Sequence, residues 1–264
     1  MNDLTLSHFD RKCLSVVVPA YNEAGTLAAI IEKLAAIPNL LEVIIVDDHS
    51  SDSTPDICQQ LSERYEFVRF VRHEKNSGKT AALKTGFALT VGEIVIVQDA
   101  DLEYDPQEIN EVIRPILQGF ADIVYGSRFM VRRAARVLYF YHYIANKALT
   151  FMSNFLTNLN ISDVETCYKA FRGDIIRNMI ITSSGFGFEV EVTAKIAKLK
   201  CKIYEVPISY YGRTYEEGKK ITYVDGIAAL GYIVWFNLFV SASRSFRAEP
   251  KLLPISQPLL EPKE

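Results

Sequence analysis

The chain has 264 residues, of which 49% are hydrophobic and 23% charged, so it can bury the core of one sizeable globular domain. Its net charge is −3 and its pI is about 5.9. With no overall basic surplus to neutralise a phosphate backbone, composition excludes nucleic acid as the main partner.

The amino terminus and the cysteines indicate where the protein works. Residues 1–12 form a polar extension without the apolar run of a signal peptide, so we expect the catalytic part to stay in the cytoplasm. None of the four cysteines has C-x-x-C spacing, and we expect them to be reduced and structural. They are Cys13, Cys58, Cys167 and Cys201.

Apolar strands alternate with amphipathic helices along the first hundred residues. This alternation predicts an α/β fold with a mainly parallel sheet and helices on both faces. We expect strands at 13–19, 41–46, 68–71 and 92–97, helices at 26–36 and 80–89, and a helix start at 51–55.

A group of acids follows the β-branched strand 92–97. Carboxylates at the carboxyl end of such a strand lie where open α/β sheets bind ligands. Oxygen ligands suit Mg²⁺ or Mn²⁺, which can bridge carboxylates to a diphosphate. Asp99, Asp101 and Glu103 are therefore candidate metal ligands. The alternative is a strand-end turn with solvated acids, because a bare Asp-x-Asp motif is common.

The first two strands also end in polar residues that suit a ligand. Tyr21 offers a ring face for a base, Asn22 and Glu23 offer polar groups, and Asp48 can accept hydrogen bonds from a ribose or base. The alternative is a loop with a half-buried tyrosine and a helix-capping asparagine. Lys79 can aim an ammonium group at a diphosphate, although its surroundings lack P-loop spacing.

The segment 128–160 is basic and aromatic. It contains no acidic residue. This pattern is typical of an interfacial helix that faces anionic lipid headgroups. A helix packed on the domain with a solvated basic face is the alternative. Its cations are Arg128, Arg132, Arg133, Arg136 and Lys147.

The last third combines a polar loop with an apolar helix. Residues 210–220 form a long polar loop around Arg213, and such loops are often functional. Residues 226–243 carry no charge, which predicts a helix in the membrane interface or on the domain, with a single tail anchor as the alternative. We expect a catalytic domain at 13–223, an apolar helix at 224–244 and a disordered tail at 245–264.

Six ordered motifs resemble one family. Together they resemble the GT-A family of inverting glycosyltransferases (family two), and within it the dolichol-phosphate mannose synthase and polyprenyl-phosphate glycosyltransferase branch. The resemblance runs from Leu14 to Leu230 and implies a GT-A, Rossmann-like sheet with interfacial helices toward the carboxyl terminus. The motifs are Val18-Pro19-Ala20-Tyr21-Asn22-Glu23, Val46-Asp47-Asp48-His49-Ser50-Ser51-Asp52, Asn76-Ser77-Gly78-Lys79, Asp99-Ala100-Asp101, Gly126-Ser127-Arg128 and Tyr211-Gly212-Arg213.

The resemblance also implies roles for particular residues. Asp101 and Glu103 would take the metal, Glu103 standing where relatives can carry Gln, and Cys167 stands where they often have Gly. The implied catalytic residues are Asp101, Arg128, Asp163 and Arg213. With the strand-end residues above, the candidate nucleotide-sugar site is Pro19, Tyr21, Asn22, Glu23, Val46, Asp48, Lys79, Asp99, Ala100, Asp101, Arg128 and Arg213.

The implied reaction is inverting transfer of a hexose, mannose or glucose, from GDP-mannose or UDP-glucose to a polyprenyl or dolichyl phosphate. The enzyme would use Mg²⁺ or Mn²⁺ at the cytoplasmic face of the membrane. A lipid phosphate is largely ionised at neutral pH, so it can attack without a strong general base. The alternatives are a family-two enzyme with a non-lipid acceptor and a nucleotide-binding module without activity.

Overall fold

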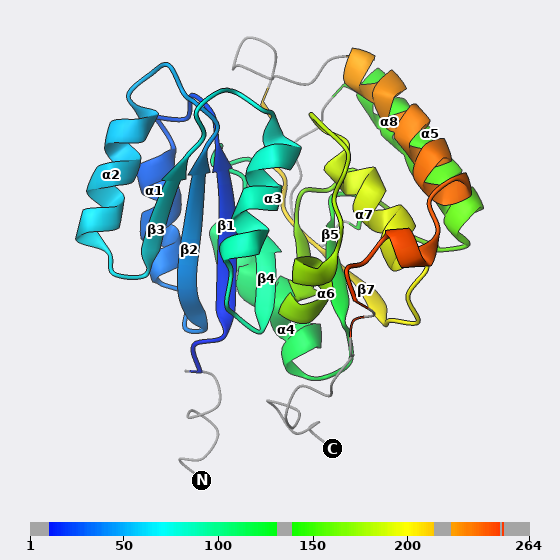
Figure 1. Ribbon diagram of the computed structural model, residues 1–264, viewed down its shortest axis with the longest axis horizontal. Helices are drawn as coiled ribbons and strands as arrows, with labels where there is room; N and C mark the ends of the chain where they lie inside the picture. The colour runs from blue at the N-terminus through cyan, green and yellow to red at the C-terminus, as the bar shows by residue number, and fades with distance from the viewer. Residues whose placement is uncertain (1–10, 131–138, 214–222, 249, 251–264) are drawn as a thin grey trace, which may run out of the picture.

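A seven-stranded sheet of order β3-β2-β1-β4-β6-β5-β7 organises the chain, with helices on both faces (Figure 1). The computed structural model describes residues 11–130, 139–213, 223–248 and 250. The strands are β1 (Leu14–Ala20), β2 (Leu40–Asp47), β3 (Val68–Arg72), β4 (Ile94–Val97), β5 (Ile123–Ser127), β6 (Lys169–Arg172) and β7 (Ile203–Pro207). The α-helices are α1 (Leu27–Ala35), α2 (Thr54–Arg64), α3 (Lys79–Leu89), α4 (Ile109–Leu117), α5 (Phe140–Thr157), α6 (Gly173–Asn178), α7 (Phe188–Ile196) and α8 (Tyr223–Leu238).

The predicted mainly parallel sheet is confirmed. Strands β1 to β4 pair in parallel, as do β5 and β7, and only β6 among the named strands runs antiparallel to its neighbours. Runs of β-branched residues buried on both faces suit such strands, because helices cover each face. The parallel strands end at one edge of the sheet, which therefore collects their carboxyl-terminal turns.

Alternate residues of β1 serve two cores. Val16 and Val18 pack with the helices α1, α2 and α4, whereas Val17 packs on the other face with α3, α6 and α7. This alternation follows from the period of two residues in a strand. Both faces are sealed, so the polar turns at the carboxyl edge sit on a rigid support.

Two features of the carboxyl-terminal region bear on the sequence predictions. The prediction of a disordered tail from residue 245 is wrong at its start, because Phe246 is 7% exposed and forms an isolated bridge with Met179. Burial of the Phe246 ring favours this order. Within the parts of the chain that the structure describes, no helix has both the length and the apolar character to cross a membrane.

Candidate functional site

Three turns with left-handed backbone lie side by side at the carboxyl ends of β1, β2 and β4. Asn22 has φ of 53°, His49 of 62° and Leu102 of 61°. Non-glycine residues in this region carry strain, and such strain tends to occur at functional sites. The fold therefore brings together the three polar segments that the sequence singles out.

Hydrogen bonds tie the turns to one another. The backbone amide of Asp48 donates to the Ala20 carbonyl at 2.8 Å, and Thr26 Oγ1 donates to the Ala100 carbonyl at 2.6 Å. Asn22 Oδ1 accepts the Ser51 amide at 2.9 Å, so this side chain is engaged in joining two turns. Tyr21 keeps 39% of its surface exposed at this edge.

Arg213 lies against the acids that follow β4. Its Nη2 is 2.8 Å from Asp101 Oδ2 and 3.5 Å from Glu23 Oε1, and its Nε is 3.2 Å from Glu103 Oε1. Three of the predicted acids thus share one guanidinium that is 23% exposed. Tyr210 adds a further contact, because its hydroxyl donates to Glu103 Oε2 at 2.7 Å.

These acids carry an excess of negative charge that favours a cation. Burial and the carboxylates of Asp99 and Glu103 raise the pKa of Asp101 to about 7, although Arg213 opposes the rise. Among the described residues, no three His, Cys, Asp or Glu side chains are grouped closely enough to hold a metal by themselves. A pair of carboxylates still fits Mg²⁺, which usually takes one or two carboxylates and completes its shell with phosphates and water.

Asp99 has a different partner from its neighbours. Lys79, the first residue of α3, places its Nζ 2.8 Å from Asp99 Oδ1 and 3.0 Å from the Cys167 thiol. Despite burial, Lys79 lowers the pKa of Asp99, so this carboxyl stays ionised. Binding of Asp99 to a metal remains a prediction, since its carboxylate pairs with an ammonium here.

Arg128 forms a buried two-pronged pair with Asp163. Its Nε and Nη2 each lie 2.7 Å from an oxygen of that carboxylate, and its backbone amide donates to the same group at 3.1 Å. Despite desolvation, the guanidinium lowers the pKa of Asp163, so the pair is ionised. Because Nη1 takes no part in this pair, the guanidinium keeps donors for an anion. No local pattern in the sequence joins these two residues, which stand 35 positions apart.

Several predicted nucleotide-binding residues hold the fold of the site together. Asp48 accepts hydrogen bonds from the amides of Ser77 and Gly78 and contacts His73 Nδ1 at 2.7 Å, so it shapes the loop before α3. Gly78 suits this loop because its φ is +87°. Val46 is fully buried and offers no side-chain surface to a ligand. Contact of these residues, and of Pro19, with a nucleoside stays a prediction.

Several buried residues with ionisable side chains lie next to Lys79. Glu189 Oε1 is 3.7 Å from Lys79 Nζ and 3.7 Å from the Cys167 thiol, and Lys169 donates to the Val164 carbonyl at 2.9 Å. Burial and the neighbouring Glu189 raise the pKa of Glu165 to about 7. Sequence reasoning assigned no role to Glu165, Lys169 or Glu189, although acids within the apolar pattern of 188–196 were a signal. All four cysteines are free, as predicted.

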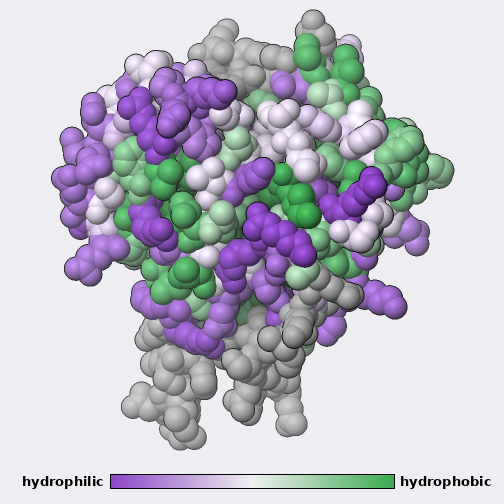
Figure 2. Space-filling model, viewed as in Figure 1, coloured by the Kyte–Doolittle hydropathy of each residue, from purple (hydrophilic) through white to green (hydrophobic). Residues whose placement is uncertain are grey.

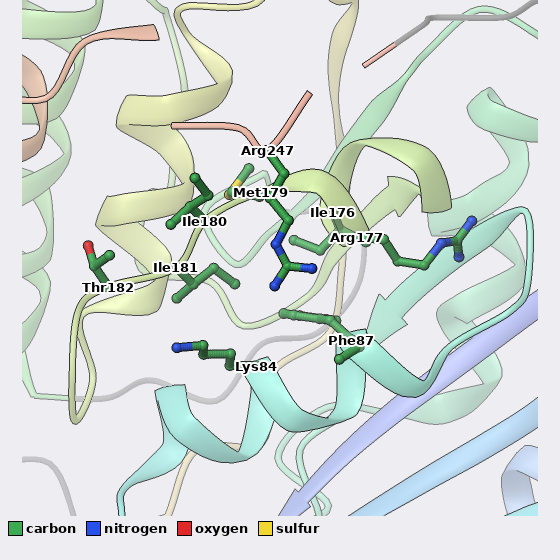
Figure 3. Close-up of a pocket in the computed structure, with 10 residues that line it drawn as sticks. Lys84, Phe87, Ile176, Arg177, Met179, Ile180, Ile181, Thr182 and Arg247 are labelled. Atoms are coloured by element: carbon green, nitrogen blue, oxygen red, sulfur yellow. The ribbon is translucent and has the colours of Figure 1, made fainter. Parts of the chain in front are cut away.

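A separate cavity of about 150 Å³ lies away from these residues (Figure 3). Phe87, Ile176 and Ile181 provide apolar walls, and Lys84 and Arg247 stand at its border. None of the predicted site residues lines it. The candidate chemistry therefore belongs to the carboxyl edge of the sheet.

Comparison with known proteins identifies the family. The profile of Glycosyl transferase family 2 matches residues 15–180. The chain belongs to this family. Among curated proteins, a dolichol-phosphate mannosyltransferase of Pyrococcus furiosus is 30% identical over 213 residues, which are 78% of this chain and 58% of that protein. An undecaprenyl-phosphate mannosyltransferase of Micrococcus luteus is 28% identical over 226 residues, 83% of this chain and 92% of that protein.

Solved structures confirm the GT-A-like fold of this family 2 member. Glucosyl-3-phosphoglycerate synthase from Mycobacterium tuberculosis, in complex with Mn²⁺, UDP and phosphoglyceric acid, has a TM-score of 0.66 and 19% identity. The match covers 85% of this chain and 78% of that one. At this identity the likeness establishes the fold and no more.

We predict that Glu165→Gln stabilises the protein at alkaline pH. With a raised pKa, folded Glu165 holds a proton between its ordinary value of 4.5 and about 7, where the unfolded chain releases it. The stability that the protonated Glu165 carboxyl contributes is thus fully present below its ordinary pKa of 4.5. It is lost as the pH rises through about 7, the pKa of this carboxyl in the folded chain. Glutamine cannot ionise, so chemical denaturation at pH 8 should show a gain of about 1–3 kcal/mol over wild type, shrinking at pH 5.

The control for this measurement is Glu66→Gln, which changes an exposed glutamate. It should leave stability unchanged at both pH values. A Glu165→Gln variant whose difference from wild type is the same at pH 5 and pH 8 contradicts the assignment of a neutral Glu165 carboxyl.

Proposed function

We propose that this chain is an inverting glycosyltransferase that moves a hexose from a nucleotide sugar to a polyprenyl phosphate. The position of Tyr210 carries the proposal. Its hydroxyl bonds Glu103 at 2.7 Å, and its ring lies 5.1 Å from the Arg128 guanidinium carbon. Tyr210 thus lies between the acids that follow β4 and a second cation, Arg128. A reaction between the diphosphate of a donor and the phosphate of an acceptor needs a cation for each of them.

The donor side is the carboxyl edge of β1, β2 and β4. Tyr21 supplies the exposed ring for the base, while Lys79 and Arg213 supply cations for the diphosphate. A guanidinium suits this task because its planar donors bind phosphate in pairs. GDP-mannose and UDP-glucose both meet these requirements.

The acids Asp101 and Glu103 would hold Mg²⁺ or Mn²⁺. The neighbouring Asp99 is paired with Lys79. When bound, such an ion neutralises charge that develops on the departing nucleoside diphosphate. Arg213 offsets the same charge from the protein side. Preorganised cations of this kind are worth most in a partly buried site, where water screens them little.

The acceptor side is built around Arg128. Asp163 fixes its guanidinium in one orientation, and the ring of Tyr210 packs against it. An acceptor phosphate is already ionised at neutral pH, so Arg128 has to place it against anionic repulsion and no base has to activate it. Attack on the anomeric carbon from the side opposite the diphosphate then inverts the sugar in one displacement.

The two mannosyltransferase relatives support a lipid phosphate as acceptor, and so does an apolar surface on α5 and α8. The two helices lie side by side, and hydrophobic residues gather along this edge of the molecule (Figures 1 and 2). We propose that this surface rests on the cytoplasmic face of a membrane, as a peripheral attachment. Its large exposed members are Phe140, Tyr141, Tyr143, Ile144, Phe151, Phe155, Val224, Ile227, Leu230, Val234, Trp235 and Leu238.

The described part of this surface is aromatic and apolar instead of basic. Lys147 turns inward from this surface, because its Nζ donates to the Ser162 carbonyl at 3.1 Å and lies 3.9 Å from the Phe129 ring centroid. The aromatic ring and the carbonyl attract the ammonium inward. Arg132, Arg133 and Arg136 lie outside the described residues.

We predict that label from a radioactive nucleotide sugar enters organic solvent only with polyprenyl phosphate as acceptor. The purified chain with Mn²⁺ should give no such product with polyprenol, which lacks the anion that Arg128 binds. Arg128→Gln should reduce transfer by about 10²-fold or more, as the loss of a key positioning group does. Transfer to 3-phosphoglycerate with none to the lipid would replace the proposal by a soluble acceptor, and donor binding without turnover would indicate an inactive module.

We also predict that Phe151→Ser/Phe155→Ser weakens binding to vesicles of phosphatidylcholine and phosphatidylglycerol by about tenfold or more, because two exposed rings lose their burial in lipid. Co-sedimentation measures the effect. The matched control is Val91→Ser/Phe120→Ser, which removes two other exposed hydrophobic side chains, 67% and 45% exposed. Equal binding of both variants and wild type contradicts the assigned surface.

A further inference from the structure

Arg213 bonds the same two carboxylates that the proposed function assigns to the metal. Its Nη2 lies 2.8 Å from Asp101 Oδ2 and its Nε lies 3.2 Å from Glu103 Oε1. Each acid therefore turns one oxygen toward a single positive group. A metal ion bound by both acids would use oxygens at about 2.0–2.2 Å, well inside the space that the guanidinium fills.

The other oxygen of each acid is held by the protein. Asp101 Oδ1 accepts the Glu103 amide at 3.1 Å, and Glu103 Oε2 accepts the Tyr210 hydroxyl at 2.7 Å. These bonds do not involve the Arg213 side chain. The orientation of the two acids is therefore set independently, and both would keep it if the guanidinium moved.

The main chain at Arg213 is also fixed. Its backbone amide donates to Glu103 Oε1 at 2.9 Å, and the Tyr211 amide donates to the Glu103 carbonyl at 2.9 Å. Rotation of the Arg213 side chain alone frees Asp101 Oδ2 and removes the guanidinium from Glu103 Oε1, which keeps the bond from the backbone amide. That side chain is 23% exposed, so it has an open side toward which to move.

We propose that Arg213 is a positioning residue that takes the place of the divalent cation between Asp101 and Glu103, and that metal binding transfers its guanidinium to the diphosphate of the donor. The inference rests on the proposed function and adds an exchange of cations at its site. Before the metal binds, Arg213 offsets the repulsion between the two acids. After it binds, the same guanidinium is available for a phosphate, which it can hold with two parallel hydrogen bonds.

The exchange has a thermodynamic consequence. The metal must displace an ion pair, so its affinity for the chain alone is reduced. A donor diphosphate gives the displaced guanidinium a new partner, and metal and donor therefore bind with positive coupling. A residue that only held the acids in place would have the opposite effect, because its loss would weaken the metal site.

The test is the affinity of the full chain for Mn²⁺ alone, measured from the electron paramagnetic resonance signal of the free ion. Arg213→Gln should bind Mn²⁺ about tenfold more tightly than wild type, which corresponds to about 1.4 kcal/mol. Arg213→Lys should fall between the two, because an ammonium is a point charge that bridges two carboxylates less well than a planar guanidinium. The lysine variant retains the charge and so serves if the glutamine variant does not fold.

The matched control is Lys33→Gln, which also removes one positive charge near this edge, from a pair with Asp105 at 3.2 Å. It should change Mn²⁺ affinity less than about twofold, since a surface pair acts through screened charge alone. Equal or weaker Mn²⁺ binding by Arg213→Gln overturns the exchange, and so does a gain no larger than that of Lys33→Gln. The readout needs no transfer, so failure here leaves the proposed reaction standing, and failure of lipid labelling leaves the exchange standing.

Discussion

Pairing of acids with cations at one edge of the sheet is the constraint on which the site depends. Lys79, Arg128 and Arg213 each lie within 2.8 Å of a carboxylate oxygen, and those carboxylates belong to Asp99, Asp163 and Asp101. Partly buried acids of this density would otherwise repel one another or take up protons. The cations hold the acids in fixed positions before any substrate arrives, and Lys79 and Arg128 lower the pKa values of Asp99 and Asp163 so that these two stay ionised.

The strand order explains why these groups meet. β1 lies between β2 and β4, so the turns after all three strands adjoin, while β5 delivers Arg128 from the other half of the sheet. A parallel sheet places all these ends on one side. The same architecture places α5 and α8, which carry the exposed apolar side chains, side by side at one side of the molecule (Figure 1). The carboxyl edge of the sheet and this apolar surface are thus parts of one scaffold, which suits the proposed transfer from a nucleotide sugar to a lipid phosphate.

Local sequence patterns predicted the features that neighbouring residues determine, namely the strands and the polar turns that follow them. The β-branched runs indicated the parallel strands, and the polar residues that end them indicated the acids of the donor edge. Pattern reasoning missed β6, which is four residues long and includes Lys169 and Arg172, and α4, which contains Pro115. It also missed the inward course of Lys147, because the partners that attract the ammonium come from other segments. The pair of Arg213 with Asp101 spans 112 residues, and only the folded chain brings them together.

The configuration of the transferred sugar tests most directly whether the acceptor phosphate displaces the nucleoside diphosphate in a single step. If the acceptor phosphate attacks the anomeric carbon in one step, an α-linked nucleotide sugar must give a β-linked sugar phosphate. Nuclear magnetic resonance of the product after transfer to polyprenyl phosphate reports this configuration. A β-linked product is the predicted result, whereas an α-linked product would require a second displacement and contradict a single attack guided by Arg128 and Arg213.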